Sequence, residues 1–439
     1  MTAPRMPNIP NPFAVPELKE KILFTLLVLL IYRIGSHITV PGVDAQATIA
    51  FFRTSGESLF SIYNLFVGGG LSRATVFALG IMPYISASIF FQIMGAVFPT
   101  VERLQKEEEG RKKITQWTRY LTVALCVAQA YGVALFLEGV TGAVPTPGLG
   151  FRLSTAFFLT TGGVFVMWLG EQITERGLGN GMSLLIFFSI VQGGVPSVIN
   201  TVASLQAGAL TFPRLLVLLA VMIVVVWFTV AITVAARRIP IQIPRKVMGR
   251  GRIREGQKSF IPLRINSANV MPIIFAQSII IVPGTLAQFS NVTWLRDLSQ
   301  EFQPGTWLWY VSFTALIVFF TYFYTAIIFN PVDVAENLKK QGGFVPGVKP
   351  GQRTAEYIDH VLSRITLPGA IFLTAIAVLP TILLNQLNVP FQFGGTSLLI
   401  VVGVALDTVQ QMQQHMILRQ YDGFMKQGRV RFRGRQRFM

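Results

Sequence analysis

The chain has 439 residues, of which 52% are hydrophobic and only 13% are charged, and its formal net charge is +17. The charged share is about half that of an ordinary soluble domain, so a water-soluble fold would expose far too much apolar surface. The composition therefore excludes a soluble globular protein and indicates a membrane protein.

A helix needs about 20 mainly apolar residues to cross a hydrocarbon core of about 30 Å. The chain contains ten such stretches, and they lack the strict apolar and polar alternation of membrane β-strands. We therefore expect an all-α polytopic membrane protein with ten transmembrane helices. In chain order the expected spans are 22–40, 74–98, 118–137, 153–173, 182–199, 214–236, 269–289, 307–329, 368–385 and 396–416.

The first expected span, 22–40, has a charged flank like that of a signal peptide, but no small-residue cleavage site follows it. We interpret it as a retained helix. With ten spans and a cytoplasmic N-terminus, almost all Lys and Arg outside the spans lie in cytoplasmic segments, including the basic tail 417–439. Because positive residues favour the cytoplasmic side, we expect both termini in the cytoplasm.

Just before the second span, the stretch 59–67 is apolar and able to form a helix, but it is too short to cross a membrane. It ends in Gly68, Gly69 and Gly70, whose permissive backbone suits a hinge. Two interpretations stay open on these residues alone. The segment is either a loop packed on the outer surface or a short re-entrant helix that can swing.

Isoleucines recur at helical spacing in two of the spans. Ile81, Ile85 and Ile89 are four residues apart in the second span, and Ile186 and Ile190 repeat this spacing in the fifth. Residues four apart share one face of a helix. Spacing alone favours ordinary lipid or helix contact for such residues, and it assigns them no function.

Two cytoplasmic connections, 237–267 and 331–367, are long, at about 30 residues each, whereas the other connections are mostly short, and long loops in compact proteins tend to be functional. The first is rich in Lys and Arg, and we expect two short strands in it around a turn at Gly249–Arg254. The second has a tip rich in Gly and Pro. Basic fingers of this kind suit docking of something large and acidic, such as ribosomal RNA or a cytosolic motor, although basic charge also serves orientation and contact with anionic lipids.

The sequence offers no catalytic chemistry of its own. The three histidines are scattered, Cys126 is a lone thiol in an apolar span, and no P-loop, catalytic triad or HExxH motif is present. Charges within the spans are sparse and form no mid-membrane carboxylate pair, which argues against an ion-coupled transporter. We therefore expect neither an enzyme nor a cofactor or metal site. The charged residues in or near the spans are Arg33, Glu171, Glu175 and Asp407.

Five stretches, in order along the chain, together resemble the SecY family, whose members are the central channel subunit of the bacterial Sec translocase. The stretches are FALGIMPYISASIF (77–90), WLGEQITERGLGNGMSLLIF (168–187), SFIPLRINSANVMPIIFA (259–276), FVPGVKPGQRTAEYIDHVLSRITLPG (344–369) and FGGTSLLIVVGVALD (393–407). The resemblance runs from the first span to the last with matching loop lengths.

The resemblance implies two pseudo-symmetric five-helix halves, here 1–205 and 206–439, around a central pore with an aliphatic waist. It overturns the interpretation of the isoleucines as lipid contacts. By motif match the pore ring is Ile81, Ile85, Ile186, Ile190, Ile274 and Ile400.

The resemblance also implies a plug at about 58–70 that closes the pore from outside, and a lateral gate formed by spans two and seven with three and eight. The expected plug residues are Leu59, Phe60, Ile62, Tyr63, Leu65, Phe66, Gly68, Gly69 and Gly70. Polar residues that we expect to tune the gate are Ser86, Ser88, Gln92, Gln277 and Ser278.

In function, the resemblance implies a passive channel in the bacterial inner membrane. Unfolded preproteins cross it, and membrane proteins leave it sideways into lipid. The energy would come from the SecA ATPase or the translating ribosome, and the small subunits SecE and SecG would accompany the channel. Signal sequences, nascent chains and anionic lipids are the other expected partners. The expected docking residues for motor or ribosome are Arg250, Arg252, Arg254, Lys349 and Arg353.

Family members usually carry arginine where this chain has Lys349, and lysine keeps the charge but lacks the bidentate fork. We therefore leave open whether Lys349, Arg353 or both make the docking contact. Composition and topology by themselves leave two functions equally open, a protein-conducting channel and an inverted-repeat secondary transporter of small solutes. The resemblance decides for the channel.

Overall fold

The computed structural model describes residues 15–54, 59–208, 211–242, 247–248, 252–253, 258–288, 301–303, 305–387 and 395–427. Within this part of the chain a helix occupies each of the ten expected spans. They are α1 (Pro16–Gly35), α4 (Met82–Val97), α6 (Glu108–Gly139), α7 (Leu149–Arg176), α8 (Gly181–Gln206), α9 (Phe212–Val234), α10 (Met271–Gln288), α12 (Trp307–Ile328), α14 (Gln352–Leu387) and α15 (Gly395–Gln427).

Among the described residues, seven helices are long and apolar enough to cross a membrane, or eight if the bent pair α4 and α5 (Pro99–Lys106) is one span. Large apolar side chains stay exposed along these helices, as on α9, where Ile223 and Trp227 are more than 60% exposed. Water would disfavour such a surface, whereas lipid accepts it, so the exposure fits an all-α membrane protein.

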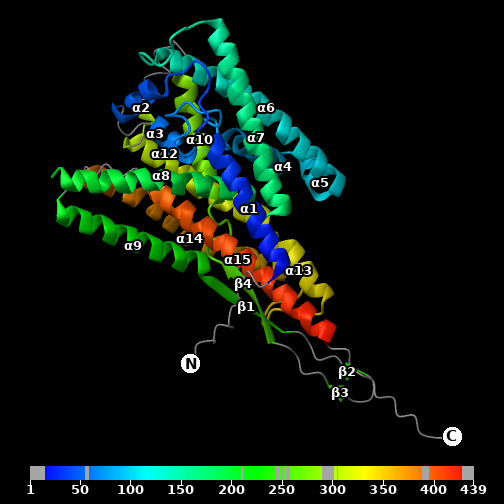
Figure 1. The fold of residues 1–439 in the computed structure, drawn as a ribbon. Helices are drawn as coiled ribbons and strands as arrows, with labels where there is room; N and C mark the ends of the chain where they lie inside the picture. Colours follow the sequence, from blue (N-terminus) through cyan, green and yellow to red (C-terminus); the bar gives the residue numbers. More distant parts are fainter. Residues whose placement is uncertain are drawn as a thin grey trace.

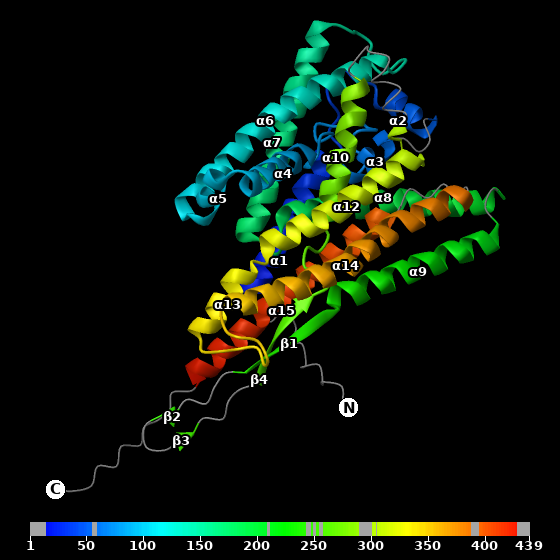
Figure 2. The same cartoon turned by 180° about the vertical axis from the view of Figure 1, so that it is seen from behind.

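The long helices of the first half of the chain pack against those of the second half (Figures 1 and 2). α6 lies between α4 and α7, and α12 packs against both α10 and α14. Contacts between α10 and α4, and between α15 and α8, connect the first five long helices to the last five. Side chains of both sets share one large buried cluster of apolar residues.

The second span begins later than the sequence suggests. Residues 74–81 form turns rather than helix, and α4 begins only at Met82. Ala74 and Gly80 have positive φ angles, of 47° and 54°, which an α-helix does not tolerate. Pro83 in the first turn then presets a helical φ. Beyond α4, Pro99 begins α5, and the chain bends there by 111°.

The connection 237–267 contains the strands expected from its sequence. β1 (Ala236–Gln242) pairs antiparallel with β4 (Lys258–Arg264), placing Ile239 opposite Ile261. Further out, β2 (Val247–Met248) pairs with β3 (Arg252–Ile253). The turn expected at Gly249–Arg254 lies largely outside the described residues. Figure 1 shows this hairpin extending away from the helices.

The connection 331–367 is not a long loop, and the expectation of one was wrong. Helix α13 (Pro331–Lys340) fills its first part, and α14 begins at Gln352 rather than near 368. Only 341–351 is a turn segment, with positive φ at Gly342, Gly347 and Gly351. The residues from 352 onward pack an apolar face, with Ile358, Val361 and Ile365 buried, and so extend the helix N-terminally from the expected span.

The connections 237–267 and 331–367 form one packed unit. Gln242 and Phe344 exchange backbone hydrogen bonds of 2.9 and 3.0 Å, which joins the hairpin to the turn 341–351. A separate apolar cluster lies beneath them, built from both connections and the start of α14. Its buried members are Ile239, Ile241, Leu263, Leu338, Val345, Ile358, Val361 and Ile365.

Two short helices lie before α4. They are α2 (Ala45–Thr54) and α3 (Leu59–Phe66), followed by a tight turn through the three glycines. α3 packs against α8 and α10 near the middle of the bundle. The short apolar segment is therefore a helix buried among the spans, which agrees with the re-entrant interpretation and not with a loop on the outer surface.

Candidate pore waist, plug and gate

Six isoleucines expected to form a waist are all buried and belong to the same apolar cluster. Each is 5% exposed or less. They come from different parts of the chain: Ile81 just before α4, Ile85 in α4, Ile186 and Ile190 in α8, Ile274 in α10, and Ile400 in α15. Of these six, Ile85, Ile186 and Ile274 line one cavity, and they come from both sets of five helices.

The helices that carry the isoleucines contact one another in turn, since α10 contacts α4 and α15, and α15 contacts α8. The isoleucine side chain has no polar atom and is stiff at χ1, so each one fills space without offering a hydrogen bond. The six side chains therefore add no polar chemistry to the buried cluster.

The short helix α3 packs against α8 and α10, and one hydrogen bond ties it to the turn before α4. Tyr63, Leu65 and Phe66 are buried, each 7% exposed or less. The Tyr63 hydroxyl donates to the backbone oxygen of Leu79 at 2.9 Å. The side chains of Leu59, Phe60 and Ile62 lie outside the described part of the structure.

The glycine turn after α3 is held in place by α8. The Gln192 side chain donates from Nε2 to the Gly68 carbonyl at 3.0 Å. Gly68 has a φ of 68°, and a Cβ at this position would meet the Ser189 Cα at 3.3 Å. In this state the turn is therefore a close packing contact that requires glycine, and not a free hinge.

A cavity of about 310 Å³ lies between α4, α8 and α10 beside the waist. Ile85, Ile186 and Ile274 form its apolar wall, and Arg119 and Glu171 contribute to its polar wall. Arg119 Nε donates to Glu171 Oε1 at 2.8 Å, so this charge is paired. The cavity therefore has one apolar wall and one polar wall.

The five expected gate residues do not all converge on this cavity. Ser88 and Gln92 line it, and Gln92 Nε2 donates to Ser88 Oγ at 3.1 Å. Gln277 and Ser278 are buried in α10 but do not line it, and Ser278 Oγ donates to the Ile274 carbonyl at 2.7 Å. Ser86 is half-buried on α4 and is also absent from the cavity wall.

Of the expected docking residues, the structure places Lys349 and Arg353 at the exposed tip of the second connection. The Thr354 hydroxyl donates to the Lys349 carbonyl at 2.9 Å, which fixes the turn before α14. Arg250 and Arg254 lie outside the described residues. Arg252 belongs to β3, but its side chain is not described.

Several contacts at the waist were missed by reasoning from the sequence. They include the bond from Gln192 to Gly68, and a buried bond of 2.8 Å between the Tyr32 hydroxyl and Ser189 Oγ. The partners are 124 and 157 residues apart, so no local pattern signals them. Within the described residues, no three His, Cys, Asp or Glu side chains lie together as a metal site would require.

Comparison with known proteins places this arrangement in a family. The SecY family model matches residues 75–409. "Protein translocase subunit SecY" of Escherichia coli (strain K12) is 43% identical over 427 residues, covering 95% of this chain and 96% of that protein. The protein of the same description from Aquifex aeolicus is 42% identical over 421 residues, covering 94% and 98%.

Solved structures share the fold at lower identity. A structure described as "The structure of a protein conducting channel" matches with a TM-score of 0.67 at 16% identity, covering 94% of this chain and 98% of that one. "Sec61 in the Canine ribosome-channel complex from the endoplasmic reticulum" matches with a TM-score of 0.63, also at 16% identity and the same coverage. Family model, relatives and fold agree, and this chain belongs to the SecY family.

Proposed function

We propose that this chain forms the pore of a protein-conducting channel, and that unfolded polypeptides cross the membrane through the isoleucine waist. The observation that carries the proposal is that six buried isoleucines, which lie in or just before four helices, share one buried apolar cluster with side chains of the short helix α3. The chain is a channel subunit and not an enzyme, as its family membership establishes. The secondary-transporter alternative has no support.

A waist of isoleucines suits passage of many different polypeptides. Narrow apolar constrictions exclude water and so block ions. Because isoleucine offers no hydrogen bond, the waist does not select one polypeptide sequence over another. The side chains of Ile81, Ile85, Ile186, Ile190, Ile274 and Ile400 would close around a moving chain as a gasket.

In this proposal α3 and the glycine turn are the plug, and the structure represents the closed channel. The plug is held by apolar packing and by two hydrogen bonds, from Tyr63 to Leu79 and from Gln192 to Gly68. A hydrogen bond contributes a net of about 1 kcal/mol to stability. A translocating chain can therefore displace the plug at modest cost.

The contact between α4 and α10 is the proposed lateral gate. When these helices separate, an apolar segment in the pore can partition between water and lipid, and its burial in lipid is favourable. Ser86, Ser88, Gln92, Gln277 and Ser278 lie on the two gate helices. We propose that these polar side chains set how apolar a segment must be to open the gate.

The same proposal divides the chain into halves at 1–205 and 206–439, with both termini in the cytoplasm of a bacterial cell and the spans in its inner membrane. The concentration of Lys and Arg in the segments assigned to the cytoplasm supports this orientation. The packed unit of the two cytoplasmic connections then projects into the cytoplasm.

This cytoplasmic unit is the proposed docking platform for the SecA motor or the ribosome. Its rigid core presents Lys349 and Arg353 at an exposed tip, where cations can meet RNA phosphates or an acidic protein face. Arg250, Arg252 and Arg254 would contribute from the hairpin. A SecY/Sec61 relative has been solved in a ribosome complex, which supports the ribosome as a partner. SecE, SecG and anionic lipids are the other proposed partners of this chain.

The proposal is tested by reconstitution into liposomes. With the motor ATPase and ATP outside, a secretory precursor should become protected from protease, and Ile186→Arg should reduce that protection because a charge in the waist is costly to dehydrate. A matched change on the lipid-exposed face, Ile223→Ala, should leave it unchanged. Uptake of small solutes without protection of the precursor would contradict the proposal.

A further inference from the structure

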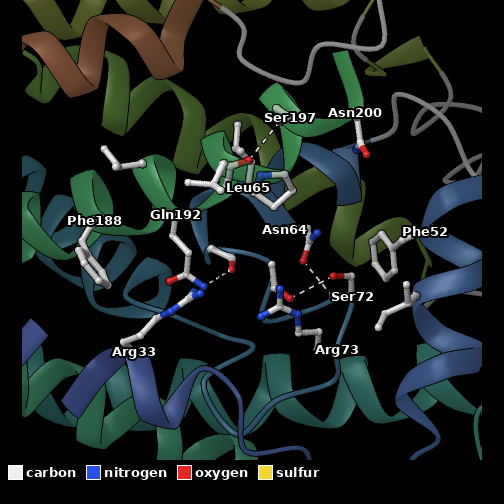
Figure 3. Close-up of a pocket in the computed structure, with 17 residues that line it drawn as sticks. Arg33, Phe52, Asn64, Leu65, Ser72, Arg73, Phe188, Gln192, Ser197 and Asn200 are labelled. Carbon is white, nitrogen blue, oxygen red and sulfur yellow. Dashed lines mark hydrogen bonds between the residues drawn. The ribbon is translucent and has the colours of Figure 1, made fainter. Parts of the chain in front are cut away.

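A second and larger cavity, of about 820 Å³, lies beside the proposed plug. Its walls come from α1, α2, α3, the glycine turn and α8. In the proposed topology it faces the outside of the cell. Figure 3 shows that its polar lining comes from several of these elements at once.

Two arginines line this cavity from different elements. Arg33 lies in the last turn of α1, and Arg73 follows the glycine turn. No Asp or Glu is among the described residues that line the cavity, and neither arginine forms an ion pair with a described carboxylate. The Nη1 atom of Arg33 is buried and has no hydrogen-bond partner among the described residues.

A histidine links the two arginines. Arg73 Nη1 lies 3.1 Å from His37 Nε2, and His37 Nδ1 lies 2.9 Å from the Arg33 carbonyl oxygen. A guanidinium only donates and a carbonyl only accepts, so the tautomer of His37 with its proton on Nδ1 satisfies both contacts. These contacts tie Arg73 to the end of α1. Figure 3 shows Arg33 and Arg73 at the same cavity.

The cavity also contains a buried acceptor that lacks a donor. Gln192 donates from Nε2 to the Gly68 carbonyl, which leaves its Oε1 buried and without a partner among the described residues. Leaving a buried polar atom unpaired costs about 1–3 kcal/mol. A ligand that fits this cavity therefore carries negative charge for the arginines and a hydroxyl proton for Gln192.

A hydrogen phosphate ion has both properties, whereas sulfate at neutral pH has only the charge. A phosphoglycerol headgroup has both as well, because its phosphodiester carries the charge and its glycerol carries the hydroxyls. The rim of the cavity adds an apolar component, because Val191 and Val195 of α8 line it and are 42% and 61% exposed. The phosphate group can thus arrive free in solution or as the headgroup of a lipid.

We propose that this cavity binds a hydroxyl-bearing phosphate group, held by Arg33 and Arg73 and donating to Gln192. Charge-assisted hydrogen bonds to phosphate are among the stronger polar contacts in proteins. Because Arg33 lies on α1 and Arg73 follows the glycine turn, the bound group bridges a membrane span and the segment that carries the plug. Binding would then stabilise the closed plug, a consequence that rests on the proposed function of α3.

The test uses the full-length chain, with any subunits that co-purify, in two settings. In detergent without added phospholipid, binding of radiolabelled inorganic phosphate is measured by equilibrium dialysis with sulfate as competitor. In nanodiscs containing phosphatidylglycerol, retained lipid is measured by native mass spectrometry. The variants are Arg33→Gln and Arg73→Gln, and the matched control is Arg214→Gln, an exposed arginine outside the cavity.

We expect each cavity variant to weaken phosphate binding or lipid retention about tenfold, as loss of one charge-assisted bond predicts, and the control to bind like wild type. Gln192→Leu should remove the preference for phosphate over sulfate. Binding in the first setting identifies a free anion and binding in the second a lipid headgroup. No binding in either setting, or equal binding by all three arginine variants, would overturn the proposal.

A separate readout isolates the consequence for the plug. In a Cys126→Ser background, a cysteine introduced by Val67→Cys is buried in the closed state, since Val67 is 1% exposed. Saturating phosphate or phosphatidylglycerol should slow its alkylation several-fold in wild type but not in Arg33→Gln. If the ligand binds through the arginines yet the alkylation rate is unchanged, the site stands and its link to the plug is refuted.

Discussion

Removing the Tyr63 hydroxyl should loosen the closed channel by an amount that the structure allows us to work out. In Tyr63→Phe the ring keeps its packing, but the Leu79 carbonyl loses its donor at a fully buried residue. The net hydrogen bond contributes about 1 kcal/mol, and the carbonyl left unpaired raises the loss to about 1–2 kcal/mol. The ratio of open to closed plug should therefore rise about five- to thirtyfold.

The assay is alkylation of a cysteine that only an open plug exposes. The chain carries Cys126→Ser and Val67→Cys, and the modification rate is measured in membranes without precursor. Tyr63→Phe should raise the rate five- to thirtyfold, whereas Tyr120→Phe, at an exposed tyrosine on α6, should not change it. An unchanged rate for Tyr63→Phe would refute the view that this bond holds the plug.

Further predictions concern the turn, the waist, the gate and the platform. Gly68→Ala should cost about 1–2 kcal/mol of closed-state stability, because its φ is 68° and its methyl group would crowd Ser189, whereas Gly139→Ala meets nothing within 4 Å and should be neutral in the same alkylation assay. Ile186→Asn should raise ion conductance in planar bilayers, since a polar waist stays wet. Gln92→Leu combined with Gln277→Leu should shift the signal hydrophobicity needed for export, and no shift would refute their role in the gate. Lys349→Glu with Arg353→Glu should weaken ribosome or motor binding at least tenfold at low salt, while Lys340→Glu, beside Glu336, should have a smaller effect.

The helices were largely predictable because a long run of apolar residues identifies a membrane-spanning helix. A run such as Phe212–Val234 must be helical in lipid whatever its neighbours are, since its backbone has no other partners. The hairpin of β1 and β4 was predictable for a similar local reason. Its alternating pattern of Ile and polar residues and its Gly-rich turn favour strands.

The predicted first residues of α4 and α14 were wrong, because the contacts that decide where these helices begin are between residues far apart in the sequence. Residues 74–81 are apolar enough for a helix, but a positive φ at Gly80, against Val67 of the plug turn, keeps them in turns. Residues 352–367 are polar enough for a loop, yet Ile358, Val361 and Ile365 pack on the hairpin and continue α14 as a helix. In both places tertiary packing overrode composition.

The waist could not be derived from spacing alone, because an isoleucine that faces lipid and one that faces a pore have the same periodicity. The resemblance to a family selected the six residues; all six are buried in one apolar cluster, and three of them, Ile85, Ile186 and Ile274, line one cavity. The contacts that hold the proposed plug could not be predicted from the sequence for another reason. Gln192 and Gly68 are 124 residues apart, and no local pattern in either segment indicates that they bond to each other.

The central claim is that polypeptide passes through the isoleucine waist, and cysteine crosslinking tests it most directly. In the Cys126→Ser background, a single cysteine replaces Ile85, Ile186, Ile274 or Ile400, and a secretory precursor with its own cysteine is stalled in mid-passage. We predict disulfides to the precursor at all four positions and none at Ile223, which is exposed on the outer face of α9. Waist cysteines that stay free while the precursor is demonstrably engaged would contradict the account.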